Sequence, residues 1–117
     1  LFMGDNGAAI LRGKGTLYAF GLNVPLLVRW PGVVRADVLS SDLISGEDLA
    51  PTLLEAAGLN APKEMTGRSF LKLLKGESFE PRSPVFAQRG ANGSGPPAQS
   101  SAFDLGLCVI TKEPKLI

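Results

Sequence analysis

An acid, an amide and an isolated lysine lie close together near the start of the chain, in the stretch GDNGAAILRGKGTLYAFGLNVP. Asp5 and Asn6 follow a short apolar run, and Lys14 lies between two glycines. Carboxylate and amide oxygens suit hard cations such as Ca²⁺ or Mg²⁺. A lysine on a permissive backbone can approach an anion as a point charge. In open α/β sheets ligands bind beyond the carboxyl ends of strands, which is where we expect the Asp-Asn pair to lie.

The spacing alone leaves simpler interpretations open. Asp-Asn-Gly is also a turn sequence, and two oxygens do not fill the Ca²⁺ shell of about six to eight. Lys14 is equally compatible with a solvated loop lysine. Five residues separate Gly7 from Gly13, one more than in the phosphate-binding loop motif, and Gly15 follows the lysine where that motif has Ser or Thr, so we reject it.

Two apolar runs frame this stretch. Residues 1–4 predict a buried strand that ends at the Asp5–Asn6 turn. Residues 24–30 predict a strand covered on both faces, as in a parallel α/β sheet, and residues 7–21 between them predict a long loop with a short helix. A further short strand is possible near Leu43.

A helix is predicted next, because apolar residues recur on one helical face at Leu49, Leu53, Leu54 and Ala57. Asp48 is the expected N-cap, Pro51 falls in the first turn, where no backbone donor is needed, and Gly58 is the expected stop. A shorter helix is expected between Ser69 as cap and Gly76 as stop. The chain then predicts a strand at 83–90 and two strands in 106–117 around a turn at Glu113 and Pro114.

Composition limits the possible functions. The chain has 117 residues, 44% of them hydrophobic and 20% charged, which predicts one packed domain at most. A net charge of +1 argues against nucleic acid and against a polybasic membrane surface. The single cysteine, Cys108, cannot form an internal disulfide framework, and its apolar neighbours predict a buried core thiol.

Taken in order, five segments of the sequence resemble the C-terminal part of a sulfatase, within the alkaline-phosphatase-like superfamily. They are DNG, RGKGTLY, VPLLVRWPGV, DLAPTLLEAAGL and GRSFLKLL. The resemblance implies an α/β fold, in which residues 1–80 are the C-terminal part of the sheet-and-helix domain. Residues 81–117 would begin the small antiparallel C-terminal subdomain. Both ends of the chain fall in apolar runs, so we expect the upstream part of the sulfatase chain as a partner.

The same resemblance implies roles for three residues. Asp5 and Asn6 match two ligands of the active-site Ca²⁺, and Lys14 matches a lysine that contacts the sulfate group of a sulfated small molecule or carbohydrate. The nucleophile of the family, a formylglycine made within a C/S-x-P-x-R-like signature, is expected upstream, because Cys108 does not match that signature. The chain also has no histidine. We therefore expect a parent sulfuric ester hydrolase, no catalytic residue in this chain, and no activity of the chain alone.

The chain departs from the family pattern beside this stretch. Ala19, Phe20 and Gly21 stand where the family often has Glu-Gly-Gly, and Asn23 where it commonly has arginine. Two alternatives stay open: a phosphoric or phosphonic monoester hydrolase of the same superfamily, and a non-catalytic module. Family habit implies a periplasmic or secreted protein, a setting in which the glycosylation motif at Asn92 would gain meaning.

Overall fold

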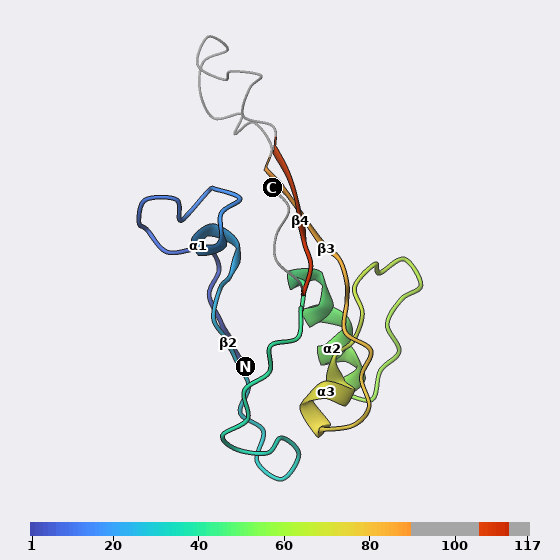
Figure 1. Cartoon of the computed structure of the whole chain (residues 1–117). Coiled ribbons are helices and arrows are strands. Elements are labelled where there is room, and N and C mark those ends of the chain that lie inside the picture. The colour runs from blue at the N-terminus through green and yellow to red at the C-terminus, as the bar shows by residue number, and fades with distance from the viewer. Residues whose placement is uncertain (90–105, 113–117) are drawn as a thin grey trace. The chain divides into compact units, whose positions relative to one another are not determined.

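The computed structural model describes residues 1–89 and 106–112 (Figure 1). The chain forms two compact units: Leu1–Leu27 with Phe86–Ile117, and Val28–Val85. Short helices and two two-stranded sheets make up the regular structure of the described residues, in keeping with an α/β fragment. None of the helices in this part of the chain has the length and apolar character that crossing a bilayer requires.

The first unit contains a two-stranded ribbon. Strand β1 (Phe2–Met3) pairs with β2 (Leu26–Leu27) in antiparallel register, with Phe2 opposite Leu27. The prediction of a parallel strand covered on both faces was wrong here, since the side chains of Phe2 and Leu27 are 62% and 59% exposed. An apolar run shows that a segment is hydrophobic, but it does not show which strand the segment pairs with or in which direction. A ladder of two residues leaves these side chains uncovered among the described residues.

A second sheet pairs β3 (Val85–Arg89) with β4 (Gly106–Ile110), and the two strands run side by side in Figure 1. Both strands were predicted. Covered and open side chains alternate along them, as expected for a sheet with one protected face. Cys108 lies on the more protected face but is only half-buried, so the prediction of a buried core thiol is corrected. The predicted turn at Glu113 and Pro114, and Asn92, lie outside the described residues.

The second unit is built on helices. A short 3₁₀ turn, η1 (Gly46–Asp48), runs into α2 (Leu49–Ala56), and α3 (Leu71–Lys75) packs against α2 (Figure 1). The predicted stops follow both helices: Gly58 lies two residues after the end of α2 and Gly76 directly after α3, with φ angles of +74° and +73°. The N-cap of α3 is Phe70, not the predicted Ser69, although the Ser69 hydroxyl just before it accepts a hydrogen bond from the Leu71 N–H at 3.2 Å. No strand forms near Leu43 in this described region.

The core of this unit lies where α2 meets the segment that enters α3. Phe70 is 1% exposed and Leu71 is 4% exposed. The Thr52 hydroxyl is buried beside them; it donates to the Asp48 carbonyl at 2.6 Å and accepts from the Phe70 N–H at 3.0 Å. One side chain therefore links the start of α2 to the core aromatic residue.

Candidate functional site

The loop between β1 and α1 (Ala19–Leu22) carries the predicted site residues and is closed by its own backbone. The Lys14 N–H donates to the Ala8 carbonyl at 2.8 Å, and the Ala8 N–H donates to the Phe20 carbonyl at 3.1 Å. The Thr16 hydroxyl donates to the Gly13 carbonyl at 2.7 Å. The bond from Lys14 to Ala8 closes residues 8–14, and the Gly4 N–H donates to the Pro25 carbonyl at 3.0 Å, so that Asp5, Asn6 and Lys14 all lie in the larger loop between Gly4 and Pro25.

The two glycines around Lys14 serve different purposes. A Cβ atom on Gly13 would lie 2.0 Å from the Ala8 carbonyl oxygen, so only glycine allows the loop to close this tightly. Gly15 has open space around it but a φ of +77°, in the left-handed region that glycine adopts without strain. The Gly-Lys-Gly sequence is thus a structural requirement for presenting the lysine.

Asp5 and Asn6 are exposed at the start of this loop. The Asn6 side-chain nitrogen donates to the Gly7 carbonyl at 3.0 Å, which leaves the amide oxygen available as an acceptor. No hydrogen bond or ion pair involves the Asp5 carboxylate among the described residues. Two oxygen donors at a turn therefore fit a hard cation in chemical type.

The described residues do not complete a metal site. No group of three or more His, Cys, Asp or Glu side chains gathers in residues 1–89 and 106–112. Since Ca²⁺ takes about six to eight oxygen ligands, Asp5 and Asn6 would supply only a part of its shell.

Arg12 lies two residues before Lys14 in the same loop. Its guanidinium carbon lies 5.2 Å from the centre of the Tyr18 ring, a cation–π distance. Its φ is +60°, rare for a residue with a side chain, and its carbonyl oxygen lies 2.8 Å from the Thr16 hydroxyl, which shares its one proton between the Arg12 and Gly13 carbonyls. Lys14 itself is exposed, with no hydrogen bond or ion pair from its ammonium group to the described residues.

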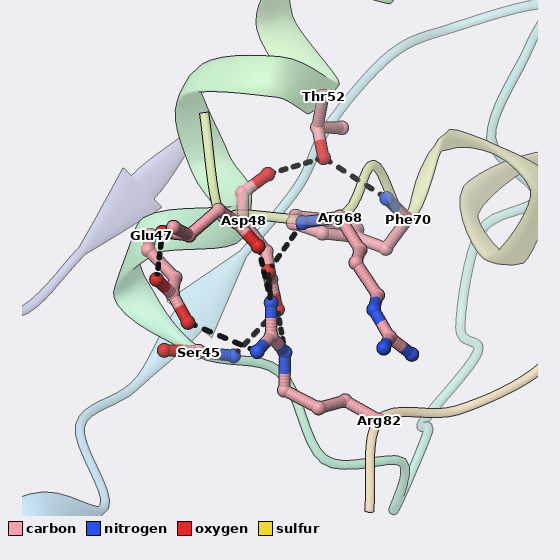
Figure 2. Close-up of polar contacts among 8 residues, drawn as sticks. Ser45, Glu47, Asp48, Thr52, Arg68, Phe70 and Arg82 are labelled. Atoms are coloured by element: carbon pink, nitrogen blue, oxygen red, sulfur yellow. Dashed lines mark hydrogen bonds and ion pairs between the residues drawn. The ribbon is translucent and has the colours of Figure 1, made fainter. Parts of the chain in front are cut away.

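A second polar cluster, absent from the sequence predictions, lies at the start of α2 (Figure 2). The buried Asp48 carboxylate accepts hydrogen bonds from the Ser45 N–H at 2.9 Å and the Arg68 N–H at 2.7 Å. Arg82 donates to the same carboxylate from Nε at 3.2 Å and also from Nη2, and it pairs with Glu47 at 2.9 Å. Protein groups donate to both oxygens of the Asp48 carboxylate, which is only 4% exposed, so this cluster stabilises the fold.

The position predicted for Asp48 is confirmed, but its mechanism is corrected. Asp48 is the N-cap residue of α2, yet its carboxylate makes no capping bond to that helix. It turns instead to the η1 turn and to Arg82. Sequence spacing carries no sign of this, because Arg82 lies 34 residues away.

Comparison with known proteins agrees with this loop-bearing segment being sulfatase-like. Residues 10–88 match the sequence model of a protein family described as "N-sulphoglucosamine sulphohydrolase, C-terminal". No solved structure matches the chain.

Several curated proteins are similar to the chain. An "Ulvan-active sulfatase" of Formosa agariphila is 38% identical over 89 residues, covering 76% of this chain and 17% of that protein. An "N-acetylglucosamine-6-sulfatase" of Bos taurus is 39% identical over 100 residues, covering 81% and 18%. A "Putative extracellular sulfatase Sulf-1 homolog" of Caenorhabditis elegans is 40% identical over 65 residues, covering 56% and 9%. The chain thus spans less than a fifth of the length of these relatives.

Proposed function

Because the chain belongs to the family of N-sulphoglucosamine sulphohydrolase C-terminal segments, we propose that it supplies part of the metal- and sulfate-binding site of a sulfuric ester hydrolase. Family membership points to the reaction class, and one structural observation links it to residues. The bond from the Gly4 N–H to the Pro25 carbonyl at 3.0 Å closes one loop that carries both the exposed cation Lys14 and the two exposed oxygen ligands, Asp5 and Asn6.

Each of the three side chains has a defined task in this proposal. Asp5 and Asn6 hold Ca²⁺ through their oxygens, together with ligands from outside this chain. Bound there, Ca²⁺ would supply positive charge against the sulfate oxygens. Lys14 brings three N–H donors to the same sulfate group and stabilises the negative charge that builds up on it during hydrolysis.

The remaining catalytic groups are proposed to come from the rest of the sulfatase chain. No histidine occurs in the sequence, and its single cysteine, Cys108, lies in a strand outside any C/S-x-P-x-R pattern. The formylglycine nucleophile is therefore assigned upstream, and the isolated chain is expected to be inactive. The alkaline-phosphatase-like fold, with 1–80 in its main domain and 81–117 in its small subdomain, is part of the same proposal.

The substrate class proposed is a sulfated carbohydrate or small molecule. The support comes from the printed names of the relatives, which include an ulvan-active sulfatase and an N-acetylglucosamine-6-sulfatase. Asn23 and the segment 19–21 separate this chain from the common family pattern, so the individual sugar is not assigned.

The proposal is tested on the full-length protein with an aryl sulfate as substrate. Removing one preorganised charge-stabilising donor costs roughly 10²–10³ in rate, so Lys14→Ala should lower kcat by about that factor. Lys63→Ala, an exposed lysine of the other unit, is the matched control and should leave kcat unchanged. Equal activity of both variants would remove Lys14 from the site. Faster hydrolysis of the corresponding aryl phosphate would reassign the enzyme to the phosphoric ester class.

A further inference from the structure

A shallow hollow in the second unit brings the only tryptophan of the chain together with two arginines. It holds about 230 Å³ and is lined by one continuous segment of the chain, residues 28–36. Trp30, Arg29 and Arg35 lie on its walls, with apolar side chains such as Val28 and Val34 completing the lining. None of these residues belongs to the Asp5–Lys14 loop.

A tight turn shapes this hollow. Trp30, Pro31, Gly32 and Val33 form a four-residue turn, in which the Val33 N–H donates to the Trp30 carbonyl at 3.1 Å. Proline at the second position and a glycine φ of +82° at the third match a type II turn. The Val34 N–H also donates to the Trp30 carbonyl, at 2.9 Å, so the reversal is held at two points.

The turn leaves both arginines available. Arg29 and Arg35 are exposed, and neither side chain forms a hydrogen bond or ion pair with the described part of the chain. Arg82 in the same unit contrasts with them, because its guanidinium is taken up by Glu47 and Asp48. Two uncommitted guanidinium groups on one small hollow form a local positive site for an anion.

The side chains that line the hollow indicate which class of ligand it could bind. A guanidinium presents paired donors that match the oxygens of sulfate or carboxylate. Trp30 is half-buried and offers an indole face, whose negative charge attracts the weakly positive C–H groups of a sugar ring. At about 230 Å³ the hollow is smaller than the roughly 300–1,000 Å³ of pockets for drug-sized ligands, so it suits a single ring with its anionic group.

We propose that the hollow formed by Arg29, Trp30 and Arg35 binds a sulfated sugar unit, as a second carbohydrate contact besides the Asp5–Lys14 loop. The choice of a sulfated sugar rests on the proposed function. A nucleotide also combines a ring with an anion, but a net charge of +1 does not favour nucleic acid as the partner. The hollow is open and small, so the expected Kd for one sugar unit is on the order of a millimolar.

The test uses the fluorescence of the 117-residue chain, in which Trp30 is the only tryptophan. N-acetylglucosamine 6-sulfate should change the emission saturably, and unsulfated N-acetylglucosamine and inorganic sulfate should bind more weakly. Arg29→Gln and Arg35→Gln should each weaken binding about two- to fivefold, as expected for exposed charge pairs. Arg68→Gln is the matched control, since it removes one exposed arginine of the same unit but keeps the backbone bond to Asp48.

Several results would overturn the proposal. They are an absent response at about ten times the expected Kd, equal binding of the sulfated and unsulfated sugars, an equal loss in Arg68→Gln, and tighter binding of adenosine monophosphate than of the sulfated sugar. This titration does not depend on catalysis. If the full-length protein hydrolysed no sulfate ester but the sugar still bound saturably near Trp30, the proposed function would be wrong and the binding hollow would stand. If the full-length protein hydrolysed sulfate esters but no sugar bound near Trp30, only the proposal for the hollow would be wrong.

Discussion

Arg82 forms a bidentate ion pair with the Asp48 carboxylate, 34 residues earlier in the chain: Nε donates to one oxygen at 3.2 Å and Nη2 donates to the other. The contact lies mostly out of water, because the two side chains are 17% and 4% exposed. It ties the start of α2 to the segment that leads into β3. Removing one partner should lower the free energy of unfolding by more than the ion pair itself contributes to it, because the other partner stays buried as an unpaired charge.

We predict that Arg82→Met lowers the free energy of unfolding of the chain by about 3–5 kcal/mol. The Asp48 carboxylate would keep its two backbone donors but lose its counter-charge. Urea unfolding measures the loss. The double variant Asp48→Asn with Arg82→Met should be less destabilised than the sum of the two single variants, because no unpaired charge remains buried.

Glu47→Gln provides the matched control for that experiment. Glu47 also pairs with Arg82, but its side chain is 42% exposed. An exposed pair of this kind contributes about 0–1 kcal/mol. If Glu47→Gln destabilised the chain as much as Arg82→Met, the contact with Asp48 would not be the dominant one.

Thr52→Val should destabilise the second unit although it preserves the shape of the side chain. The substitution removes the acceptor of the Phe70 N–H and leaves a buried donor unpaired, at a cost of about 1–3 kcal/mol. Thr52→Ser keeps the hydroxyl and loses only a methyl group, about 1 kcal/mol. Urea unfolding of both variants should give the larger loss for valine, and the reverse order would show that packing outweighs the hydrogen bonds.

The helices could be predicted from apolar spacing and glycine stops within each segment, whereas the role of Asp48 depends on contacts with residues far away in the sequence. The stops at Gly58 and Gly76 depend on φ angles that the glycines themselves make possible, so they could be read from sequence. The role of Asp48 could not, because its carboxylate is satisfied by Arg82 and Arg68 rather than by its own helix. In a sequence, an aspartate that caps a helix cannot be told apart from an aspartate that forms a buried ion pair.

In the candidate site, too, the local features could be predicted from the sequence and the contacts between distant residues could not. The Asp5–Asn6 turn and the isolated Lys14 were visible in the sequence, and their sharing of one loop became clear only with the bond from the Gly4 N–H to the Pro25 carbonyl. The two strands around the loop were expected in a parallel sheet, but they form an antiparallel ribbon. The resemblance to sulfatases is confirmed by the family match, while the roles of the three site residues stay a prediction.

Gly13→Ala should open the loop, whereas the same change at Gly46 should not perturb it. A Cβ atom on Gly13 would meet the Ala8 carbonyl oxygen at 2.0 Å, so the bond from Lys14 to Ala8 must break or shift. Gly46 has open space and no left-handed φ. Hydrogen exchange should show loss of protection at the Lys14 amide in Gly13→Ala alone. Retained protection would mean that the loop closes by another route.

Self-association is expected for the isolated chain, because the β1–β2 ribbon is short, apolar and uncovered. Phe2 and Leu27 face each other in the register and are both more than half exposed. Uncovered apolar strands pair readily with further copies. Leu27→Lys should reduce the apparent mass in light scattering, and Leu39→Lys, equally apolar and 98% exposed in the other unit, serves as the control. A monodisperse monomer at high concentration of the unmodified chain would contradict this prediction.

The last prediction concerns Ca²⁺ in the full-length protein and follows from the proposed function. Asp5→Ala removes a ligand and a negative charge, whereas Asn6→Ala removes a ligand only, so Asp5→Ala should weaken Ca²⁺ binding more. Even loss of residues that merely support metal ligands costs roughly 10–100-fold in affinity, so Asp5→Ala should cost at least that much. Lys14→Ala should leave the Ca²⁺ content unchanged and weaken binding of inorganic sulfate instead. Calorimetry with Ca²⁺ and with sulfate separates the three variants. If Asp5→Ala retained the wild-type Ca²⁺ affinity, Asp5 and Asn6 would form only a turn that opens the lysine loop, and the metal ligands would have to be sought elsewhere.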